Sequence, residues 1–349
     1  MQMKQRVQRA LLTGAYQSGA YHLIEKLSGG IGAILMLHRV VGEKKDCLDQ
    51  HLTVTTAYLD ATLATFRRLG LELVSIDDMA AALAGKKKLD SRAVALTFDD
   101  GYRDNLTKAL PILEKHQAPA TIYVVSGAPD RNMDVWHLRL EHLIWGSSSL
   151  PLNALGLNET LNLSSLEAKT AAYARLTDLA FKDLPRFKAF LFELLPLSEL
   201  PDGQLMDEVY LSWKDLRGLA SHPLITIGSH TENHPVLAAL SEEEAFGNIV
   251  RGRTRIRQEL GCPVDHFAYP YGRRGECDAR EFRLAREAGF ATAVTTRYGA
   301  VHPEHRDHLY CLPRMNFGGP VERIEDAVLD VLGVRATLSK RCLRPVVTA

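Results

Sequence analysis

The feature that most constrains the fold is an alternation between short apolar runs and longer stretches whose apolar residues recur at helical spacing. Short runs that are apolar throughout are typical of strands in a parallel sheet, which is buried on both faces. Parallel strands need a long crossover connection, and the amphipathic stretches between the runs suit crossover helices. The pattern therefore predicts an α/β protein built from βα units. The candidate strands are Ile31–Leu37, Leu71–Ser75, Ala93–Phe98, Ala120–Val125, Leu224–Gly228, His266–Tyr269, Thr292–Thr295 and Leu309–Pro313.

One region, residues 130–210, interrupts this alternation. It contains no convincing strand and reads as several helices. Because candidate strands resume on both sides, we interpret the region as a helical insertion in one βα loop. Such an insertion could shape a substrate cleft or could simply cover one face of the sheet.

Composition excludes several classes of protein. Lys and Arg total 42, as do Asp and Glu, so there is no basic excess of the kind that nucleic-acid binding requires. The five cysteines are scattered without a CxxC pair, which argues against a disulfide framework and suits a reducing compartment. No apolar stretch approaches the roughly 18 residues of a membrane span, and no signal peptide is recognised, so a cytoplasmic location is expected. A helix near the N-terminus could pack on the domain or make peripheral contact with a membrane.

Polar residues follow several candidate strands directly. His38 follows the first strand, Asp99 and Asp100 follow the third, His230 follows the fifth, and Tyr271-Gly272 lies just after the sixth. In barrels of βα units, reactive groups gather at the C-terminal ends of the strands, where the loops converge. The sequence therefore predicts a functional site at that end.

Two of these elements indicate a metal site. Adjacent carboxylates leaving a strand point in opposite directions, so Asp99 and Asp100 can serve different roles, although an Asp before Gly101 can also simply form a turn. We interpret His230 and His234 as the i and i+4 positions of a helical turn, within reach of one ion, although capping or surface positions also explain such pairs. Two histidines and one carboxylate leave coordination positions open for water and substrate, as a catalytic site requires.

The segments TFDDG, SHTENH and FAYPYG, in this order, resemble the first three motifs of the polysaccharide deacetylase (NodB-homology) family, carbohydrate esterase family 4. The resemblance covers residues 31–128 and 220–315. It implies a distorted (β/α)7 barrel and removal of N-acetyl groups from glycans. It further implies that Asp99 is the general base, that Asp100, His230 and His234 bind a divalent metal, and that the Tyr271-Gly272 turn holds the oxyanion through the backbone N–H of Tyr271. Zn²⁺ is the metal that we expect, with Co²⁺, Ni²⁺ or Fe²⁺ as alternatives.

With this resemblance the chain divides into an N-terminal helix over residues 1–30, a barrel over residues 31–320 that carries the insertion, and a C-terminal helix and tail over residues 321–349. The partner that it implies is a carbohydrate bearing N-acetyl groups. No nucleic acid and no transmembrane segment are expected.

The sequence departs from the family pattern in two places. Most members carry an arginine that orients the base where this chain has Ala268, and most have a late histidine motif that is absent here. The opening segment ILMLHRV resembles members whose barrel is circularly permuted, which makes His38 the candidate general acid; a structural histidine is the alternative. For the missing arginine we suggest Arg314 in LPRMNF, from its position alone, while a surface or core-rim arginine is nearly as consistent with the sequence.

Two other functions remain open from the sequence. The same site could remove a formyl or O-acetyl group from a lipid-linked sugar. Alternatively, the chain could be a non-catalytic carbohydrate-binding protein on the same barrel, which Ala268 favours and the retained Asp99, Asp100, His230 and His234 oppose. Nothing in the motifs selects one glycan or sugar intermediate.

Overall fold

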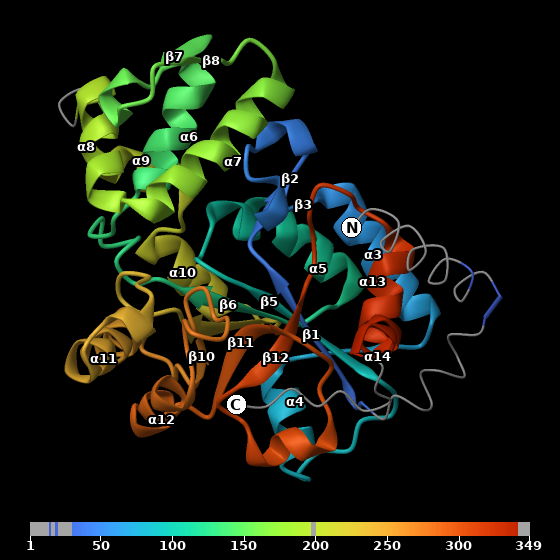
Figure 1. Ribbon diagram of the computed structural model, residues 1–349. Helices are drawn as coiled ribbons and strands as arrows, with labels where there is room; N and C mark the ends of the chain where they lie inside the picture. The colour runs from blue at the N-terminus through green and yellow to red at the C-terminus, as the bar shows by residue number, and fades with distance from the viewer. Residues whose placement is uncertain (1–13, 15–17, 20–29, 197–199, 341–349) are drawn as a thin grey trace.

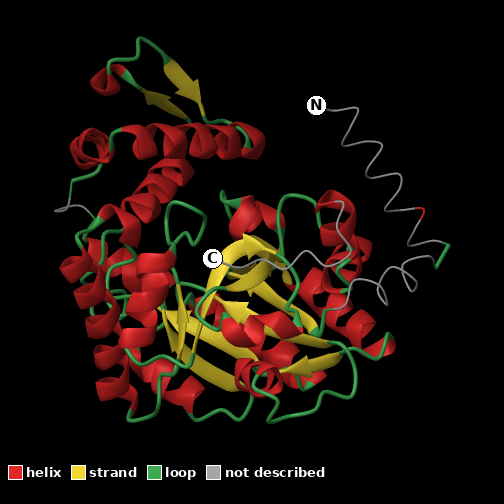
Figure 2. Ribbon diagram, turned by 60° about the horizontal axis from the view of Figure 1, so that its bottom comes forward, coloured by secondary structure: helices red, strands yellow, loops and turns green. Residues whose placement is uncertain are grey.

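Parallel strands close into a barrel at the centre of the molecule, with helices around it (Figures 1 and 2). The computed structural model describes residues 14, 18–19, 30–196 and 200–340, so the N-terminal helix expected over residues 1–30, and any membrane contact through it, fall almost wholly outside the described residues. The barrel strands, in order around the barrel, are β1 (Gly32–Leu37), β12 (Leu312–Asn316), β11 (Thr292–Tyr298), β10 (His266–Ala268), β9 (Ile225–Ser229), β6 (Ala120–Val124) and β5 (Ala93–Phe98).

Strand β1 closes the barrel, since it pairs with β12 on one side and with the whole of β5 on the other, from Gly32 opposite Ala93 to Leu37 opposite Phe98. On its other edge β5 pairs first with β4 (Glu72–Val74) and then with β6. The seven-stranded barrel predicted from the sequence is thereby confirmed. The first strand of the chain lies between the TFDDG strand and the last strand, as a permuted barrel would have it, although the permutation itself stays a prediction.

The last strand begins later than the sequence suggested. Residues 309–311, which were expected to open it, instead lie in a turn in which the Cys311 N–H donates to the carbonyl of His308 at 3.1 Å. β12 therefore runs from Leu312 to Asn316, and Arg314 lies inside the strand and not after its end. Arg314 therefore shares the side-chain alternation of β12.

Local signals mark both ends of the longest helix among the described residues, α11 (Glu242–Leu260). It opens with a capping box between Ser241 and Glu244 and closes at Gly261 in the left-handed conformation. The other helices that pack around the barrel are α3 (Thr56–Arg68), α5 (Leu110–His116), α10 (Trp213–Ala220), α12 (Ala279–Glu287), α13 (Ile324–Val331) and α14 (Val334–Lys340).

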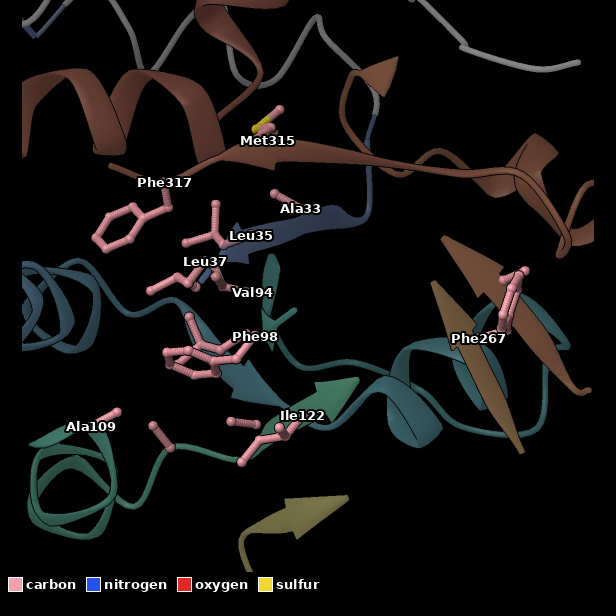
Figure 3. Close-up of a cluster of buried hydrophobic side chains, with 14 of the residues drawn as sticks. Ala33, Leu35, Leu37, Val94, Phe98, Ala109, Ile122, Phe267, Met315 and Phe317 are labelled. Carbon is pink, nitrogen blue, oxygen red and sulfur yellow. The ribbon is translucent and has the colours of Figure 1, made fainter. Parts of the chain in front are cut away.

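Side chains alternate across each barrel strand, and this alternation creates two cores. Outward-pointing residues such as Leu35 of β1 and Phe98 of β5 pack beneath the helices, as Figure 3 shows. Inward-pointing residues such as Ile34 and Ala95 fill the lumen together with Met79 of α4 (Ile76–Leu83), which covers the end where the strands begin. At the end where the strands begin, the lumen also holds His266, whose ring hydrogen-bonds Thr292 at 2.8 Å and Asp77 at 2.9 Å.

The insertion leaves the barrel after β6 and therefore starts at the C-terminal end of the strands (Figure 1). It has its own core, in which residues such as Leu176 and Phe187 are fully buried. Its elements are α6 (Trp136–Gly146), β7 (Ser149–Pro151), β8 (Thr160–Asn162), α7 (Leu166–Lys182), α8 (Leu184–Leu194) and α9 (Asp202–Val209).

The expectation that this region lacks strands was wrong, because β7 and β8 form an antiparallel hairpin. Each strand has three residues, and Leu150 is the only one of the six that is buried. Such short strands cannot display the alternation by which half-buried strands are recognised.

Within the described part of the chain, no helix is both long enough and apolar enough to span a membrane.

Candidate active site

Strand alternation sends three of the predicted site residues into the same end of the barrel lumen. His38 follows β1 with the inward parity of Ile34, Asp99 follows β5 with the parity of Ala95, and Arg314 lies within β12 with the parity of Leu312. All three positions lie at or near the C-terminal ends of their strands. The barrel therefore brings Asp99 and Arg314 together although they are 215 positions apart in the sequence.

Asp99 and Arg314 form a bidentate ion pair inside the barrel. Nη1 of Arg314 donates to Oδ1 of Asp99 and Nη2 donates to Oδ2, each at 2.7 Å. The guanidinium is fixed further by bonds from Nε to the Thr295 carbonyl at 2.9 Å and from Nη1 to Thr97 Oγ1 at 3.1 Å. Both side chains are almost fully buried. A carboxylate held by the two-pronged guanidinium has a single orientation.

The pKa of Asp99 reflects two opposing influences. Burial alone would raise it, but the charge of Arg314 and the nearby His230 together hold the pKa well below its ordinary value. Asp99 is therefore ionised at neutral pH. A carboxylate offers about four lone-pair positions, of which Arg314 uses two, so each oxygen can still accept a further proton donor.

His38 lies beside this pair. Its Nε2 is 4.0 Å from Oδ2 of Asp99, beyond hydrogen-bond distance, and its side chain is 12% exposed. Two backbone contacts hold it there: the Asp99 N–H donates to the Leu37 carbonyl at 2.9 Å, and Asn105 Nδ2 donates to the carbonyl of His38 at 2.8 Å. Asn105 was not among the site residues predicted from the sequence. Its place at the end of TFDDGYRDN was the only signal that could have found it.

Asp100, His230 and His234 form the one group of metal-ligating side chains found in the described residues, and their ligand atoms all lie within 4.8 Å of one another. Oδ1 of Asp100 is 3.5 Å from Nε2 of His230 and 3.4 Å from Nε2 of His234. Two ligands that each lie about 2.0–2.2 Å from a tetrahedral ion are themselves about 3.3–3.5 Å apart. Oδ1 of Asp100 is buried and has no hydrogen-bond partner among the described residues. The donor set and its spacing therefore fit a divalent metal.

The two imidazoles are in a state that suits metal binding. Nδ1 of His230 lies 2.7 Å from the carbonyl of Ala268, which can only accept, so the proton is on Nδ1 and Nε2 keeps its lone pair. Burial lowers the pKa of His230 and that of His234 to about 4, so both rings are neutral at pH 7. Ala268 stands at the position where the family resemblance leads one to expect an arginine, and its backbone carbonyl instead fixes the ring of His230.

The helical turn expected for His230 and His234 is wrong. The segment after β9 is a loop in which Thr231 (φ 70°) and His234 (φ 55°) are left-handed, and the His234 N–H donates to Thr231 Oγ1 at 3.0 Å. Asp100 (φ 72°) and Tyr271 (φ 61°) are left-handed as well. Such conformations cost about 1–3 kcal/mol each for most residues and persist where the surroundings enforce them, often at functional sites.

The turn at Tyr271-Gly272 borders the metal cluster, with the Tyr271 ring centroid 5.0 Å from that of His234. The Tyr271 carbonyl accepts a bond from Thr296 Oγ1 at 2.6 Å, whereas its N–H donates to no acceptor within the described ranges. Gly272 is required, because a Cβ there would lie 2.8 Å from the Thr296 nitrogen and φ is 70°. The turn thus presents a free backbone donor beside the metal site.

The insertion reaches the site through its last segment. Tyr210 stacks on Tyr102 with ring centroids 5.1 Å apart, and its hydroxyl lies 3.1 Å from Nε2 of His137. Leu211 N–H donates to the Gly101 carbonyl at 2.9 Å, directly after the metal-ligand position. The insertion is therefore tied to the loop that carries Asp99 and Asp100.

Comparison with known proteins identifies the family. The family model for polysaccharide deacetylases matches residues 86–293, well over half of the chain. This chain belongs to the polysaccharide deacetylase family. Two curated relatives are the poly-β-1,6-N-acetyl-D-glucosamine N-deacetylase of Escherichia coli strain K12, 40% identical over 83 residues, and the putative polysaccharide deacetylase YxkH of Bacillus subtilis strain 168, 29% identical over 92 residues. The matched segments are 24% and 26% of this chain, and they span only 12% and 31% of those proteins.

Solved structures share the fold along most of the chain. The Streptococcus pyogenes deacetylase PplD in complex with acetate matches with a TM-score of 0.58 at 19% identity, covering 86% of this chain and 99% of that one. IcaB from Ammonifex degensii matches with a TM-score of 0.54 at 18% identity, covering 88% and 97%. At these identities the likeness establishes the barrel fold and not the substrate.

Proposed function

We propose that this protein is a metal-dependent hydrolase that removes N-acetyl groups from an N-acetylhexosamine-containing glycan or glycan precursor. The observation that carries the proposal is that two different arrangements lie side by side. One is the buried carboxylate of Asp99, held in a fixed orientation by Arg314. The other is the group of one carboxylate and two neutral histidines whose spacing suits a bound metal ion. A non-catalytic carbohydrate-binding protein on this barrel would not need an arginine that orients Asp99.

Asp100, His230 and His234 are the residues that would hold the metal, with Zn²⁺ as the first candidate for a site of two imidazoles and a carboxylate. When bound there, a divalent metal supplies polarisation of the acetamide carbonyl and a lowered pKa for attacking water.

The chain's own residues divide the remaining work. Asp99 accepts the proton of the attacking water, through a lone pair that Arg314 leaves free, and Arg314 keeps the carboxylate aimed. The free N–H of Tyr271 donates to the oxygen that becomes negative in the tetrahedral intermediate. His38 delivers a proton to the nitrogen that leaves as an amine. The products are acetate and a free amino sugar.

The names of the relatives support the substrate class. The Escherichia coli relative is named as a deacetylase of poly-β-1,6-N-acetyl-D-glucosamine, and other fold relatives are named as polysaccharide deacetylases. Because this chain spans only a small part of those curated proteins, we propose an N-acetylhexosamine glycan as the class and name no single polymer.

Acetate release from a panel of β-1,6-linked and β-1,4-linked N-acetylglucosamine oligomers, with and without chelator, tests the proposal. We expect release that stops on chelation, returns when Zn²⁺ is added, and is absent from Asp99→Asn. Formate or O-linked acetate as the only product would move the assignment to the deformylase or esterase alternative. If no substrate gave chelator-sensitive release that depends on Asp99, the hydrolase proposal would fail.

A further inference from the structure

A continuous series of aromatic rings runs from the metal cluster to the insertion. The ring centroid of Tyr271 is 5.0 Å from His234, that of Phe181 is 6.3 Å from Tyr271, and that of Trp136 is 6.0 Å from Phe181. His234 and Tyr271 belong to barrel loops, whereas Phe181 lies in the last turn of α7 and Trp136 opens α6. The insertion thus meets the barrel at the edge of the site through apolar rings.

Phe181 is exposed in a way that its packing does not explain. The residue is 63% exposed, and Trp145 and Val321 are the only other large hydrophobic residues of the described chain that are clearly exposed. Its contacts with Trp136 and Tyr271 are near-perpendicular, at 86° and 78°. Phe181 joins the half-buried rings of Trp136 and Tyr271 in one apolar group at the rim of the site, and apolar groups rimmed by polar residues are where binding surfaces are found.

We propose that Phe181, supported by Trp136 and Tyr271, forms a stacking subsite for the sugar ring next to the one whose acetamide is hydrolysed. This inference rests on the proposed function and adds to it a residue of the insertion that binds substrate. Phe181 packs against Tyr271, and Tyr271 in turn packs against His234, which is a proposed metal ligand. Phe181 is therefore farther from the reacting group, and the neighbouring sugar and not the reacting one would lie against it.

The chemistry of the rim matches a sugar. A pyranose ring has an apolar face of C–H groups, which stacks on an aromatic ring, and hydroxyl groups around its edge. Asp134 accepts a bond from the backbone N–H of Trp136 at 3.3 Å and pairs with Lys188 at 2.7 Å, so charged groups that can bind hydroxyls lie beside Trp136. Aromatic and charged groups at one edge suit an amphipathic ring better than they suit an acyl chain.

Trp213 is the alternative to Phe181 as the aromatic residue on which a sugar ring would stack. It borders a cavity of about 420 Å³ that is also lined by Tyr210 and Arg131. Its indole N–H already donates to Asp130 at 2.8 Å, however, and the guanidinium of Arg255 lies over its ring at 5.2 Å. One face of Trp213 is therefore covered, whereas Phe181 is open.

The test compares Phe181→Ala with Trp145→Ala, an exposed aromatic residue of the same insertion that makes no ring contact with this series. Binding of N-acetylglucosamine monomer and oligomers to the full chain is measured by calorimetry in an Asp99→Asn background, so that affinity is read without turnover. We expect oligomers to bind Phe181→Ala about tenfold more weakly, equivalent to about 1.4 kcal/mol. The monomer should be unaffected, and Phe181→Trp should restore binding.

Several results would overturn the subsite. Equal oligomer affinity in Phe181→Ala and its parent would do so, as would a loss seen only in Trp213→Ala, which would place the sugar in the cavity. So would a dimer in sedimentation that Phe181→Ala dissociates while glycan affinity is unchanged. Because binding is measured apart from acetate release, Phe181-dependent binding without hydrolysis would reject only the proposed function. Hydrolysis indifferent to Phe181 would reject only the subsite.

Discussion

Asp99 and Asp100 are neighbours in the chain, yet their surroundings are opposite. Both oxygens of Asp99 accept bonds from Arg314 at 2.7 Å, whereas Oδ1 of Asp100 is buried, has no hydrogen-bond partner among the described residues, and faces two neutral histidines. The left-handed backbone of Asp100 turns its side chain away from the direction that Asp99 takes. The strain of that turn is what separates the two carboxylates.

The contrast shows how one dipeptide can serve two roles. A carboxylate that is to accept a proton benefits from a fixed direction, which the ion pair gives to Asp99. A carboxylate that is to bind a cation must instead keep a lone pair free of protein donors, as Asp100 does. Substitutions that remove one of these properties at a time test the division of roles.

The largest expected effect comes from replacing each acid in turn. Asp99→Asn removes the base and should lower kcat about 1,000-fold or more, as general-base loss does, while bound metal measured by elemental analysis stays at the wild-type level. Asp100→Asn should lose the metal and the activity together. If Asp99→Asn also lost its metal, the division of roles between the two residues would be wrong.

The second effect concerns the ion pair. Arg314→Met leaves Asp99 charged and buried, so we expect the free energy of unfolding at pH 7, measured in urea, to fall by about 3 kcal/mol. Adding Asp99→Asn to this variant removes the charge and should recover most of the loss. A single variant as stable as the wild type would contradict the buried pair.

The same variant has a defined pH dependence. In the wild type the pKa of Asp99 is depressed, so its ionisation stabilises the fold above the usual carboxyl pKa and this contribution is lost as the pH falls below that value. In Arg314→Met, burial without the counter-charge raises the pKa instead. The stability difference between the two proteins should therefore shrink as the pH is lowered from 7 to 4, and a constant difference would argue against this electrostatic account.

His38→Gln tests the proposed acid at the edge of the Asp99 site. We expect kcat to fall about 100-fold, the lower range for loss of a general acid, with metal content unchanged. The loss should be smaller for a substrate whose leaving group needs no proton, such as an acetate ester of a nitrophenol. An equal loss on both substrates would assign His38 a structural role.

The smallest expected effect comes from replacing Thr97, whose hydroxyl accepts a hydrogen bond from Arg314. Thr97→Val removes the hydroxyl that accepts from Nη1 and that donates to the Leu35 carbonyl at 2.7 Å, at a cost of about 1 kcal/mol in stability. We expect kcat to fall a few-fold, while Thr97→Ser, which keeps the hydroxyl, stays near wild type. Identical behaviour of the two variants would show that the hydroxyl does not position Arg314.

The sequence by itself determined the βα alternation and the identity of the polar residues, and the family resemblance of its motifs implied the barrel. Apolar runs of strand length fixed the strands to within a few residues, because the period of side chains along a strand is a local property. The motifs around Asp99, Asp100, His230 and His234 were readable for the same reason, since each is a short segment that leaves a strand.

Only the tertiary structure decided how these residues meet. The pairing of Arg314 with Asp99 spans 215 positions and depends on Arg314 lying on the same lumen-facing side of β12 as Leu312. The two histidines converge through left-handed residues of a loop, and Phe181 comes to the site from a helix of the insertion. These contacts follow from barrel closure and backbone strain, which no local pattern of residues encodes.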